Sequence, residues 1–303
     1  MGVDVAFRIK LPATSANLGA AFDTAAVALD FHLEIVAEPA ERYSIAASGR
    51  NAAQCSATEN NLILNTYRST LGREGRAEVP LALEMKNGIP LGMGCGSSAA
   101  SRLAALALAS HFGELGWSPE RILAEACALE GHPDNAAACW LGGLVLAACD
   151  GPKVHAARVE PPAGWLAMLV MPKAPLPTSQ ARAVLPAQYS RADAVANIQA
   201  AALLGAAFAQ GRGELLRAAM ADRIHQPYRA RICPLLPLLL PLAGRGGILG
   251  VALSGAGPSV LVVISGRESV ASAAEAVHAA IADGPEAEIL VAAFEPAGCV
   301  IER

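Results

Sequence analysis

A glycine-rich segment that runs directly into an alanine- and leucine-rich helix constrains this chain most. Gly92, Gly94 and Gly96 alternate with other residues, so the backbone can adopt positive φ angles and approach a bulky anion closely. Ser97 and Ser98 follow where the first free N–H groups and the positive dipole end of the predicted helix lie. The pattern predicts a phosphate-binding loop, although a glycine cluster before a helix can also be a plain turn.

The same segment does not fit two common phosphate-binding motifs. No lysine follows the glycines, so it is not the GxxxxGK[ST] loop. Its G-x-G-x-G spacing, without a suitably placed acidic residue downstream, is not the dinucleotide fingerprint.

Composition limits the class of protein. The 303 residues carry a net charge of −4 without a long basic run, so we expect no nucleic-acid partner. No apolar run reaches the roughly 18 residues of a membrane span, and the N-terminus lacks secretory features, so we expect a cytoplasmic protein without a membrane partner. The seven cysteines contain no C-x-x-C pair, which argues against disulfides and zinc. Cys95, beside a helix N-terminus, could have a lowered thiol pKa, but packing is favoured.

Hydrophobic periodicity predicts an α+β fold in two halves. The expected strands are 5–11, 25–36, 80–86, 142–148, 165–171, 247–253, 259–264 and 288–294. The expected helices are 60–73, 97–115, 119–129, 178–184, 192–210, 214–221 and 269–282. Proline and glycine punctuate residues 150–163, so we place the boundary between a domain of residues 1–157 and one of 158–303. The prolines of 234–242 predict a broken, buried segment, with its leucines in the core rather than at an interface.

Two further segments carry small and polar residues at strand ends. Residues 12–23 read PATSANLGAAFD, which suits recognition of a small polar molecule but could be a capped turn. Residues 253–259 read LSGAGPS, a second glycine-rich turn in the other half of the chain. Two such turns in different halves imply a site at their interface.

Residues 130–135, EGHPDN, lie between two predicted helices. Their carboxylates suit Mg²⁺, whereas one histidine with two acids is a poor zinc set. His132 is as well explained by capping the next helix as by a ligand role. Glu130 lies against the negative end of a helix dipole, a placement that calls for a nearby cation.

In their order along the chain (12–23, 90–101, 130–135 and 253–259), the four motifs resemble those of the GHMP kinase superfamily, and PATSANLG with EGHPDN is similar to its homoserine kinases. The resemblance spans nearly the whole chain. It implies an N-terminal ribosomal-protein-like α+β domain, a C-terminal ferredoxin-like domain, and ATP and substrate in the cleft between them. It further implies ATP-dependent phosphorylation of L-homoserine in threonine biosynthesis, with Mg²⁺, by a homodimer.

The resemblance also implies roles for particular residues. Ser98 and Glu130 would coordinate Mg²⁺, and with Asp134 and Asn135 they would be catalytic. Asn61 would lie near the adenine. The ATP phosphates would contact Pro90, Leu91, Gly92, Met93, Gly94, Cys95, Gly96, Ser97, Ser98, Ala99, Ala100 and Ser101. The substrate would contact Asn17, Asp23, Asp134, Asn135, Thr178, Arg182 and Arg229.

The chemistry of the substrate agrees with that set. A zwitterionic amino acid needs an acid for its ammonium, which Asp23 or Asp134 can supply, and cations for its carboxylate, which Arg182 and Arg229 can supply. Lys86 is a candidate additional cation for the phosphates. Asp134 and His132 are candidate bases, although a loose transition state needs little early deprotonation. We expect a structural role for His225.

The sequence departs from the family pattern in two places. Ala20 and Ala21 replace a Pro-Gly pair, so a turn with positive φ at residue 21 would be strained, and Cys95 replaces a leucine or isoleucine. A mevalonate-type kinase and a non-catalytic nucleotide-binding relative therefore stay open. The intact Ser98, Glu130 and Asp134 argue against the second.

Overall fold

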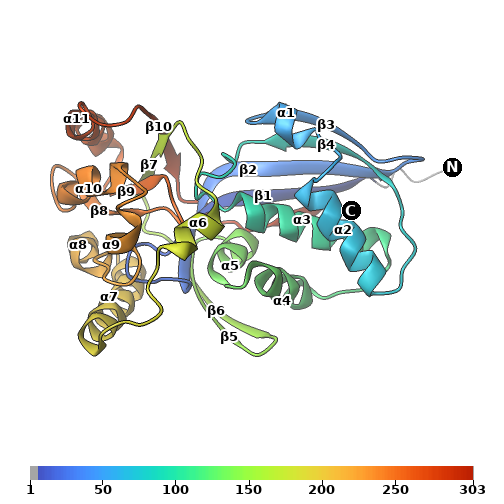
Figure 1. Ribbon diagram of the computed structural model, residues 1–303, viewed down its shortest axis with the longest axis horizontal. Helices are drawn as coiled ribbons and strands as arrows, with labels where there is room; N and C mark the ends of the chain where they lie inside the picture. Colours follow the sequence, from blue (N-terminus) through green and yellow to red (C-terminus); the bar gives the residue numbers. More distant parts are fainter. Residues whose placement is uncertain (1–5, 303) are drawn as a thin grey trace.

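Residues 6–302, which the computed structural model describes, form two β-sheets with helices packed on them (Figure 1). In this part of the chain the first sheet has seven strands, in the order β11-β1-β2-β4-β3, with β5 beside β2 and β6 beside β5. Its strands are β1 (Phe7–Ala16), β2 (Ala25–Pro39), β3 (Ser44–Gly49), β4 (Leu81–Asn87), β5 (Leu144–Asp150), β6 (Lys153–Val159) and β11 (Val300–Glu302). β2 is long because residues 33–39 pair with β4 and residues 25–27 with β5.

The helices of the first half include α3, the helix that follows the glycine loop. They are α1 (Ala52–Cys55), α2 (Leu62–Arg73), α3 (Ser97–Phe112), α4 (Pro119–Glu130) and α5 (Asp134–Leu141). α3 packs on β1, α2 and α4, and its alanines and leucines are almost all buried. Ser118 caps α4 and Pro119 occupies its first turn, positions that serine and proline favour.

The second sheet has the ferredoxin-like strand order β10-β7-β9-β8, with every neighbouring pair antiparallel. Its strands are β7 (Leu166–Pro172), β8 (Ile248–Leu253), β9 (Val260–Ile264) and β10 (Ala287–Ala293). The helices of this half are α6 (Thr178–Ala183), α7 (Arg191–Gln210), α8 (Leu216–Ala219), α9 (Gln226–Arg229), α10 (Leu235–Leu239) and α11 (Val270–Ala280). Three short 3₁₀ helices lie among these described residues, at Gly213–Leu215, Leu240–Leu242 and Arg267–Ser269.

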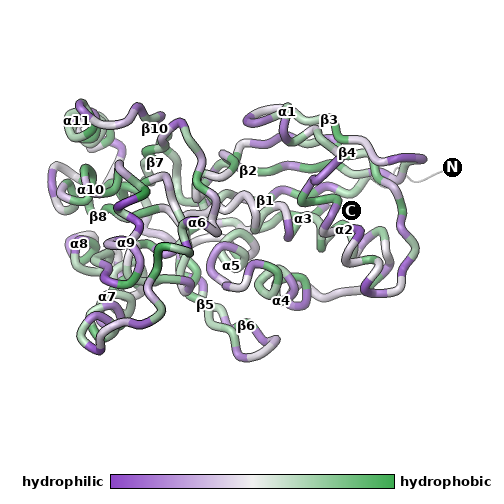
Figure 2. The backbone as a smooth tube through the Cα atoms, viewed as in Figure 1, coloured by the Kyte–Doolittle hydropathy of each residue, from purple (hydrophilic) through white to green (hydrophobic). Residues whose placement is uncertain are grey.

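Alternation along β7 joins the two halves. Ala167, Leu169 and Met171 belong to the large core of the first half, whereas Met168 and Val170 pack in a second core with α10 and α11. A strand with both faces buried reads as a continuous apolar run, which is how residues 166–171 read. Hydrophobic segments accordingly run through both sheets, and many hydrophilic segments lie in the outer connections (Figure 2).

The observed elements correct the sequence expectations in places. β1 continues through Ala16 instead of ending at Leu11, with a register shift at Pro12 that accommodates the proline in a strand. The helix expected over 214–221 is a 3₁₀ turn followed by the single turn of α8. The strands β3, β6 and β11 were not expected, and β6 shows no period-2 burial that could have indicated it. Leu235, Leu236 and Leu239 are buried, as the expectation of core packing requires, whereas Leu238 is 37% exposed.

The connection between the halves runs from residue 160 to 165, close to the expected seam. β6 in the first sheet ends at Val159, and β7 in the second begins at Leu166. The chain then returns, because β11 pairs with β1 in the first sheet. The boundary between residues 157 and 158 stays a prediction.

Within the described chain, α7 is the one helix whose length and composition would allow it to cross a membrane. Of its most apolar stretch of 18 residues, 22% is buried. Leu204 and Phe208 on one face are buried, whereas Val195 and Ile198 on another are 46% and 67% exposed. α7 therefore packs on the domain through one face and leaves apolar side chains on its outer surface.

Candidate active site

The glycine loop and the two other turn motifs meet at the N-terminus of α3. Gly92, Gly94 and Gly96 all have positive φ, at +69°, +72° and +74°. A Cβ on Gly94 would clash with the backbone oxygen of Ser254, and one on Gly96 with the hydroxyl of Thr14. Only glycine therefore lets the loop pack against both neighbouring motifs.

These contacts leave the start of α3 open toward a cavity. Gly96 is the N-cap residue and provides no side-chain cap for the first N–H groups of the helix. The cavity has a volume of about 300 Å³ and is lined by Gly94, Gly96, Ser97 and Ser98, together with residues of the other three motifs. Free helix N–H groups beside three glycines are a site for an anion such as phosphate.

A second cavity of about 360 Å³ adjoins the first and shares Gly92, Ser97 and Ser98 with it. Its wall is mostly apolar, with Leu62, Ile63, Met85, Ile89 and Leu91 and a few amides, and suits a flat nucleobase.

Asn61 belongs to the wall of this second cavity. Its Oδ1 caps α2 by accepting from the N–H groups of Ile63 (3.0 Å) and Leu64 (3.2 Å), and its Nδ2 donates to the carbonyl of Ala57 (3.0 Å). Asn61 therefore holds the wall in place, and its contact with adenine stays a prediction.

Ser98 and Glu130, the predicted metal ligands, lie side by side. The Ser98 hydroxyl donates to Oε1 of Glu130 at 2.7 Å, and the same oxygen is 2.9 Å from Nη1 of Arg102. Glu130 ends α4, and its side chain is 9% exposed. A hydroxyl and a carboxylate oxygen fit a hard divalent cation such as Mg²⁺.

Asp134 begins α5 and is held by its neighbours. Its Oδ1 lies 2.5 Å from Nδ1 of His132 and accepts from the backbone N–H of Asn135 at 2.7 Å. The Asn135 side chain accepts in turn from the hydroxyl of Thr14 at 2.7 Å. Burial lowers the pKa of His132, but the hydrogen bond to Asp134 and its charge outweigh this and raise that pKa above 6.5.

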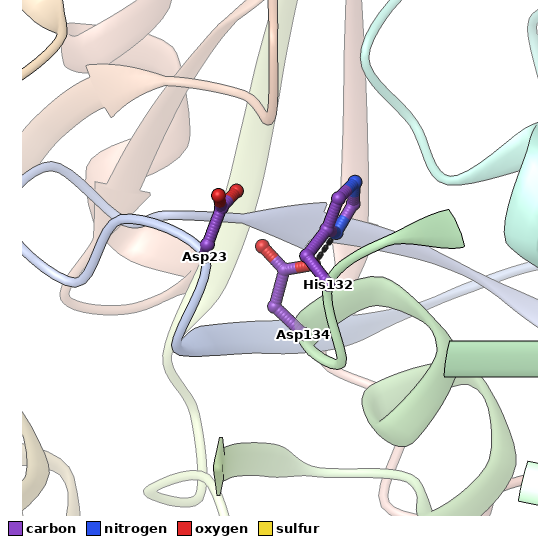
Figure 3. Close-up of side chains that lie close together, drawn as sticks. All are labelled: Asp23, His132 and Asp134. Atoms are coloured by element: carbon purple, nitrogen blue, oxygen red, sulfur yellow. Dashed lines mark hydrogen bonds and ion pairs between the residues drawn. The ribbon is translucent and has the colours of Figure 1, made fainter. Parts of the chain in front are cut away.

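Asp23, from the loop between β1 and β2, lies across from Asp134 and His132 (Figure 3). The nearest ligand atoms of these three residues lie within 4.8 Å of one another. Asp23 also forms a two-point ion pair with Arg182 of α6, with distances of 3.2 Å and 2.7 Å. Arg182 already pairs with Asp23, and His132 already bonds to Asp134. The two carboxylates therefore suit a small cationic group better than a metal ion.

Arg229 completes this end of the cavity. It is 1% exposed, its Nε donates to the carbonyl of Ala181 at 3.1 Å, and its Nη1 to that of Gly255 at 3.3 Å. Burial and the nearby charge of Arg182 lower its pKa. Phe22 lies below both guanidinium groups, 5.6 Å from Arg182 and 5.3 Å from Arg229. Two arginines on an aromatic ring, beside an acid, form a site with both signs of charge.

Asn17 organises the loop that carries Asp23. Its Nδ2 donates to the carbonyl of Gly255 at 2.7 Å, and its Oδ1 accepts from the N–H of Asp23 at 2.9 Å. Asn17 thus connects the segment 12–23 to the glycine-rich turn at 253–259. Thr178, at the start of α6, lines both cavities.

Three expectations are corrected or decided by the structure. Lys86 is exposed on the far side of β4 and lines neither cavity, so it cannot assist at the phosphates from this position. The loop takes its positive φ at Asn17, Leu18, Gly19 and Asp23, and therefore the alanines at 20 and 21 cause no strain there. Cys95 is buried, and burial raises the pKa of its thiol to about 12, so the packing role is confirmed.

Two residues escape the motif analysis: Arg102, which lines the first cavity, and Phe22, which lies beneath the two arginines. Arg102 is four residues after Ser98 on α3, a spacing that places both on one helix face and could have indicated it. Phe22 belongs to the segment 12–23, but nothing in the local sequence indicates that two arginines lie above its ring.

Comparisons with known proteins match both halves of the chain. The model of the GHMP kinases N terminal domain matches residues 61–143, and the GHMP kinases C terminal model matches residues 204–283. The homoserine kinase of Solibacter usitatus is 46% identical over 273 residues, 89% of this chain and 90% of that protein. The homoserine kinase of Deinococcus radiodurans is 37% identical over 298 residues, 98% of this chain and 97% of that protein.

Solved structures agree in fold. Homoserine kinase from Cytophaga hutchinsonii gives a TM-score of 0.81 at 24% identity, covering 100% of this chain and 99% of that chain. L. major mevalonate kinase in complex with R-mevalonate gives 0.65 at 14% identity, covering 97% and 96%. The α+β class and the two-domain architecture predicted from the sequence are confirmed.

Proposed function

The chain belongs to the homoserine kinases of the GHMP kinase family, and on this premise we propose that it transfers the γ-phosphoryl group of ATP to the side-chain hydroxyl of L-homoserine. The product is O-phospho-L-homoserine, an intermediate of threonine biosynthesis. ATP is the phosphate donor of the family, and Mg²⁺ is part of the proposal.

The Asp23–Arg182 pair is the observation that carries the substrate assignment. Without substrate the two groups neutralise each other, at 2.7 Å between Nη2 and Oδ1. A zwitterionic amino acid carries one positive and one negative group. Its ammonium can replace Arg182 as the partner of Asp23, and its carboxylate can replace Asp23 as the partner of Arg182. Arg229, buried below, adds a second cation for the carboxylate.

The nucleotide is assigned to the two adjoining cavities. The apolar wall that Asn61 supports would receive the adenine, and residues 90–101 with the free N–H groups of α3 would receive the phosphates. Ser98 and Glu130 would hold Mg²⁺, which supplies positive charge to the phosphate oxygens when bound. The loop contributes backbone dipoles that are fixed before the nucleotide binds.

Asp134 and Asn135 lie between the substrate and nucleotide ends of the first cavity. Nδ1 of His132 is already bonded to Oδ1 of Asp134, a contact that raises the pKa of His132, so we assign Asp134 as the acceptor for the hydroxyl proton. The second carboxylate oxygen of Asp134 lies on the side of Asp23 (Figure 3). Since phosphoryl transfer has a loose transition state, positioning of the hydroxyl counts for more than removal of its proton.

The two alternative functions fit this site less well. Mevalonate has a carboxylate but no ammonium, so Asp23 would lose its partner whenever Arg182 bound the substrate. A non-catalytic relative would not need Ser98, Glu130 and Asp134, which are present and mutually organised.

Turnover measured with each alcohol tests the proposal. We expect ADP release and a phosphorylated product by mass spectrometry with L-homoserine, and at least hundredfold lower kcat/KM with mevalonate. No turnover of millimolar homoserine by the folded protein would overturn the substrate, and no ADP release with any amino alcohol would overturn the kinase activity.

The homodimer and the cytoplasmic location belong to the same proposal. The exposed Val195 and Ile198 of α7 are apolar surface that a second copy could cover. Light scattering after size exclusion measures the oligomeric state, and a monomer at micromolar concentration would contradict the dimer.

A further inference from the structure

Arg102 is a cation in the cavity that no motif assigns. It lies one helical turn after Ser98 on α3, and its Nη1 is 2.9 Å from Oε1 of Glu130. The same nitrogen donates to the carbonyl of Leu129, which anchors the side chain at the C-terminal end of α4. Its side chain is 24% exposed, so it retains room to move.

Oε1 of Glu130 therefore already has two partners. Oε1 accepts from Ser98 and pairs with Arg102, and it is also the oxygen nearest to the hydroxyl that would share a cation. A magnesium ligand lies about 2.1 Å from the ion, so a guanidinium on the same oxygen is repelled by the two positive charges of the ion. A metal ion bound by Oε1 of Glu130 therefore competes with Arg102.

Among the described residues, the phosphate end of the cavity otherwise lacks a cationic side chain. Of the arginines that line the cavity in the described chain, Arg182 is paired with Asp23 and Arg229 with backbone carbonyls at the far end. The glycine loop has no lysine, and Lys86 lies elsewhere. Arg102 is next to Ser98, where the open helix N-terminus would hold phosphate.

We propose that Arg102 is a positioning residue with two partners. It pairs with Glu130 in the free protein, which keeps the carboxylate in place and its charge balanced, and it turns to the phosphate chain once Glu130 ligates the metal ion. A guanidinium can bind phosphate oxygens at two points, so Arg102 would do the work of the absent loop lysine. This inference rests on the proposed ATP-dependent function.

Two equilibrium measurements test it without turnover. Mn²⁺ binding to the nucleotide-free protein is measured by electron paramagnetic resonance, and AMP-PNP binding at saturating Mg²⁺ by calorimetry. In Arg102→Gln we expect Mn²⁺ to bind about threefold or more tightly, because a competing cation is gone, and AMP-PNP to bind about tenfold more weakly. Arg102→Lys keeps the charge, so its affinities for Mn²⁺ and for AMP-PNP should both be close to those of the wild type.

The opposite signs separate this role from a structural one, since a damaged site would weaken both affinities. Arg73→Gln is the matched control, because Arg73 pairs with Glu125 on the same helix α4 but lines neither cavity. Mn²⁺ affinity that is unchanged or lower in Arg102→Gln would overturn the competition, and unchanged AMP-PNP affinity would overturn the phosphate contact.

The outcomes also separate this inference from the proposed function. If the wild-type protein bound no AMP-PNP with or without metal, the ATP-dependent function would fail, and the inference with it. If the Arg102 pattern appeared but homoserine was not phosphorylated, only the substrate assignment would fail.

Discussion

Nη1 of Arg229 lies 3.2 Å from Nδ1 of His225, and both side chains are buried. Because a guanidinium can only donate, Nδ1 must accept, and the imidazole is neutral with its proton on Nε2. Nε2 then donates to the carbonyl of Gly19 at 2.9 Å. His225 thereby connects the arginine of the substrate site to the loop that carries Asp23, which agrees with the structural role expected from the sequence.

This neutral histidine predicts a loss of stability in acid. Burial lowers the pKa of His225 below 6.5, and although the charge of Asp222 raises it, that of Arg229 lowers it further. Below pH 6.5 the unfolded chain therefore binds a proton that the folded protein resists, and the free energy of unfolding falls by up to about 1.4 kcal/mol per pH unit for this group.

Urea unfolding at pH 7.5, 6.5 and 5.5 checks this. His225→Gln should show a shallower decline than the wild type, whereas His278→Gln, which changes an exposed residue, should not. Equal slopes in all three proteins would contradict the assignment of a neutral His225.

Asp23→Asn should impair recognition of the amino acid. The amide cannot offer a charge to the substrate ammonium, and Arg182 loses its own partner. A hydrogen bond to a charged group contributes about 1.5–3 kcal/mol, so kcat/KM for homoserine should fall roughly tenfold to hundredfold, mainly through KM.

Steady-state kinetics over a range of homoserine concentrations measures this change. Asp193→Asn removes a comparable acid, which lies 3.5 Å from Arg223 outside the cavity, and should leave the kinetics unaltered. An Asp23→Asn enzyme with wild-type KM would exclude Asp23 from ammonium binding.

The sequence was most informative where function restricts the backbone. The glycines of the loop are needed at φ near +70° against Ser254 and Thr14, and these positions were visible as a motif. The ferredoxin-like half was predictable in its elements because buried strands such as β7 read as continuous apolar runs.

Contacts between distant residues could not be read in the same way. Asp23 and Arg182 are 159 residues apart, and their mutual pairing depends on how the two halves pack. β6 is exposed along most of its length and is held by its hairpin partner β5, so its residues show little period-2 burial. Arg102 looks like an ordinary surface residue until α4 brings Glu130 beside it.

Gly94→Ala should disrupt the glycine loop more than its backbone angle alone would explain. At φ +72° a Cβ costs about 1–2 kcal/mol. Here it would also clash with the backbone oxygen of Ser254, which cannot move without shifting the glycine-rich turn at 253–259. Gly75 has φ +65° and nothing within 4 Å of a Cβ, so Gly75→Ala incurs only the first cost.

The two variants are compared by urea unfolding and by ATP binding. Gly94→Ala should lose clearly more stability than Gly75→Ala and should bind ATP more weakly, whereas Gly75→Ala should keep wild-type affinity. Equal losses in the two variants would mean that the loop can shift away from Ser254.

Glu130→Gln tests the metal ligand. The amide can still accept from Ser98, so the local structure should persist, but a neutral oxygen binds Mg²⁺ far more weakly than a carboxylate. Transition-state stabilisation should fall by roughly 3 kcal/mol or more, about a hundredfold in kcat, and the Mg²⁺ concentration for half-maximal rate should rise. Glu125→Gln, on the same helix and paired with Arg73, should change neither quantity. A Glu130→Gln enzyme with wild-type rate and Mg²⁺ dependence would show that the metal ion is held elsewhere.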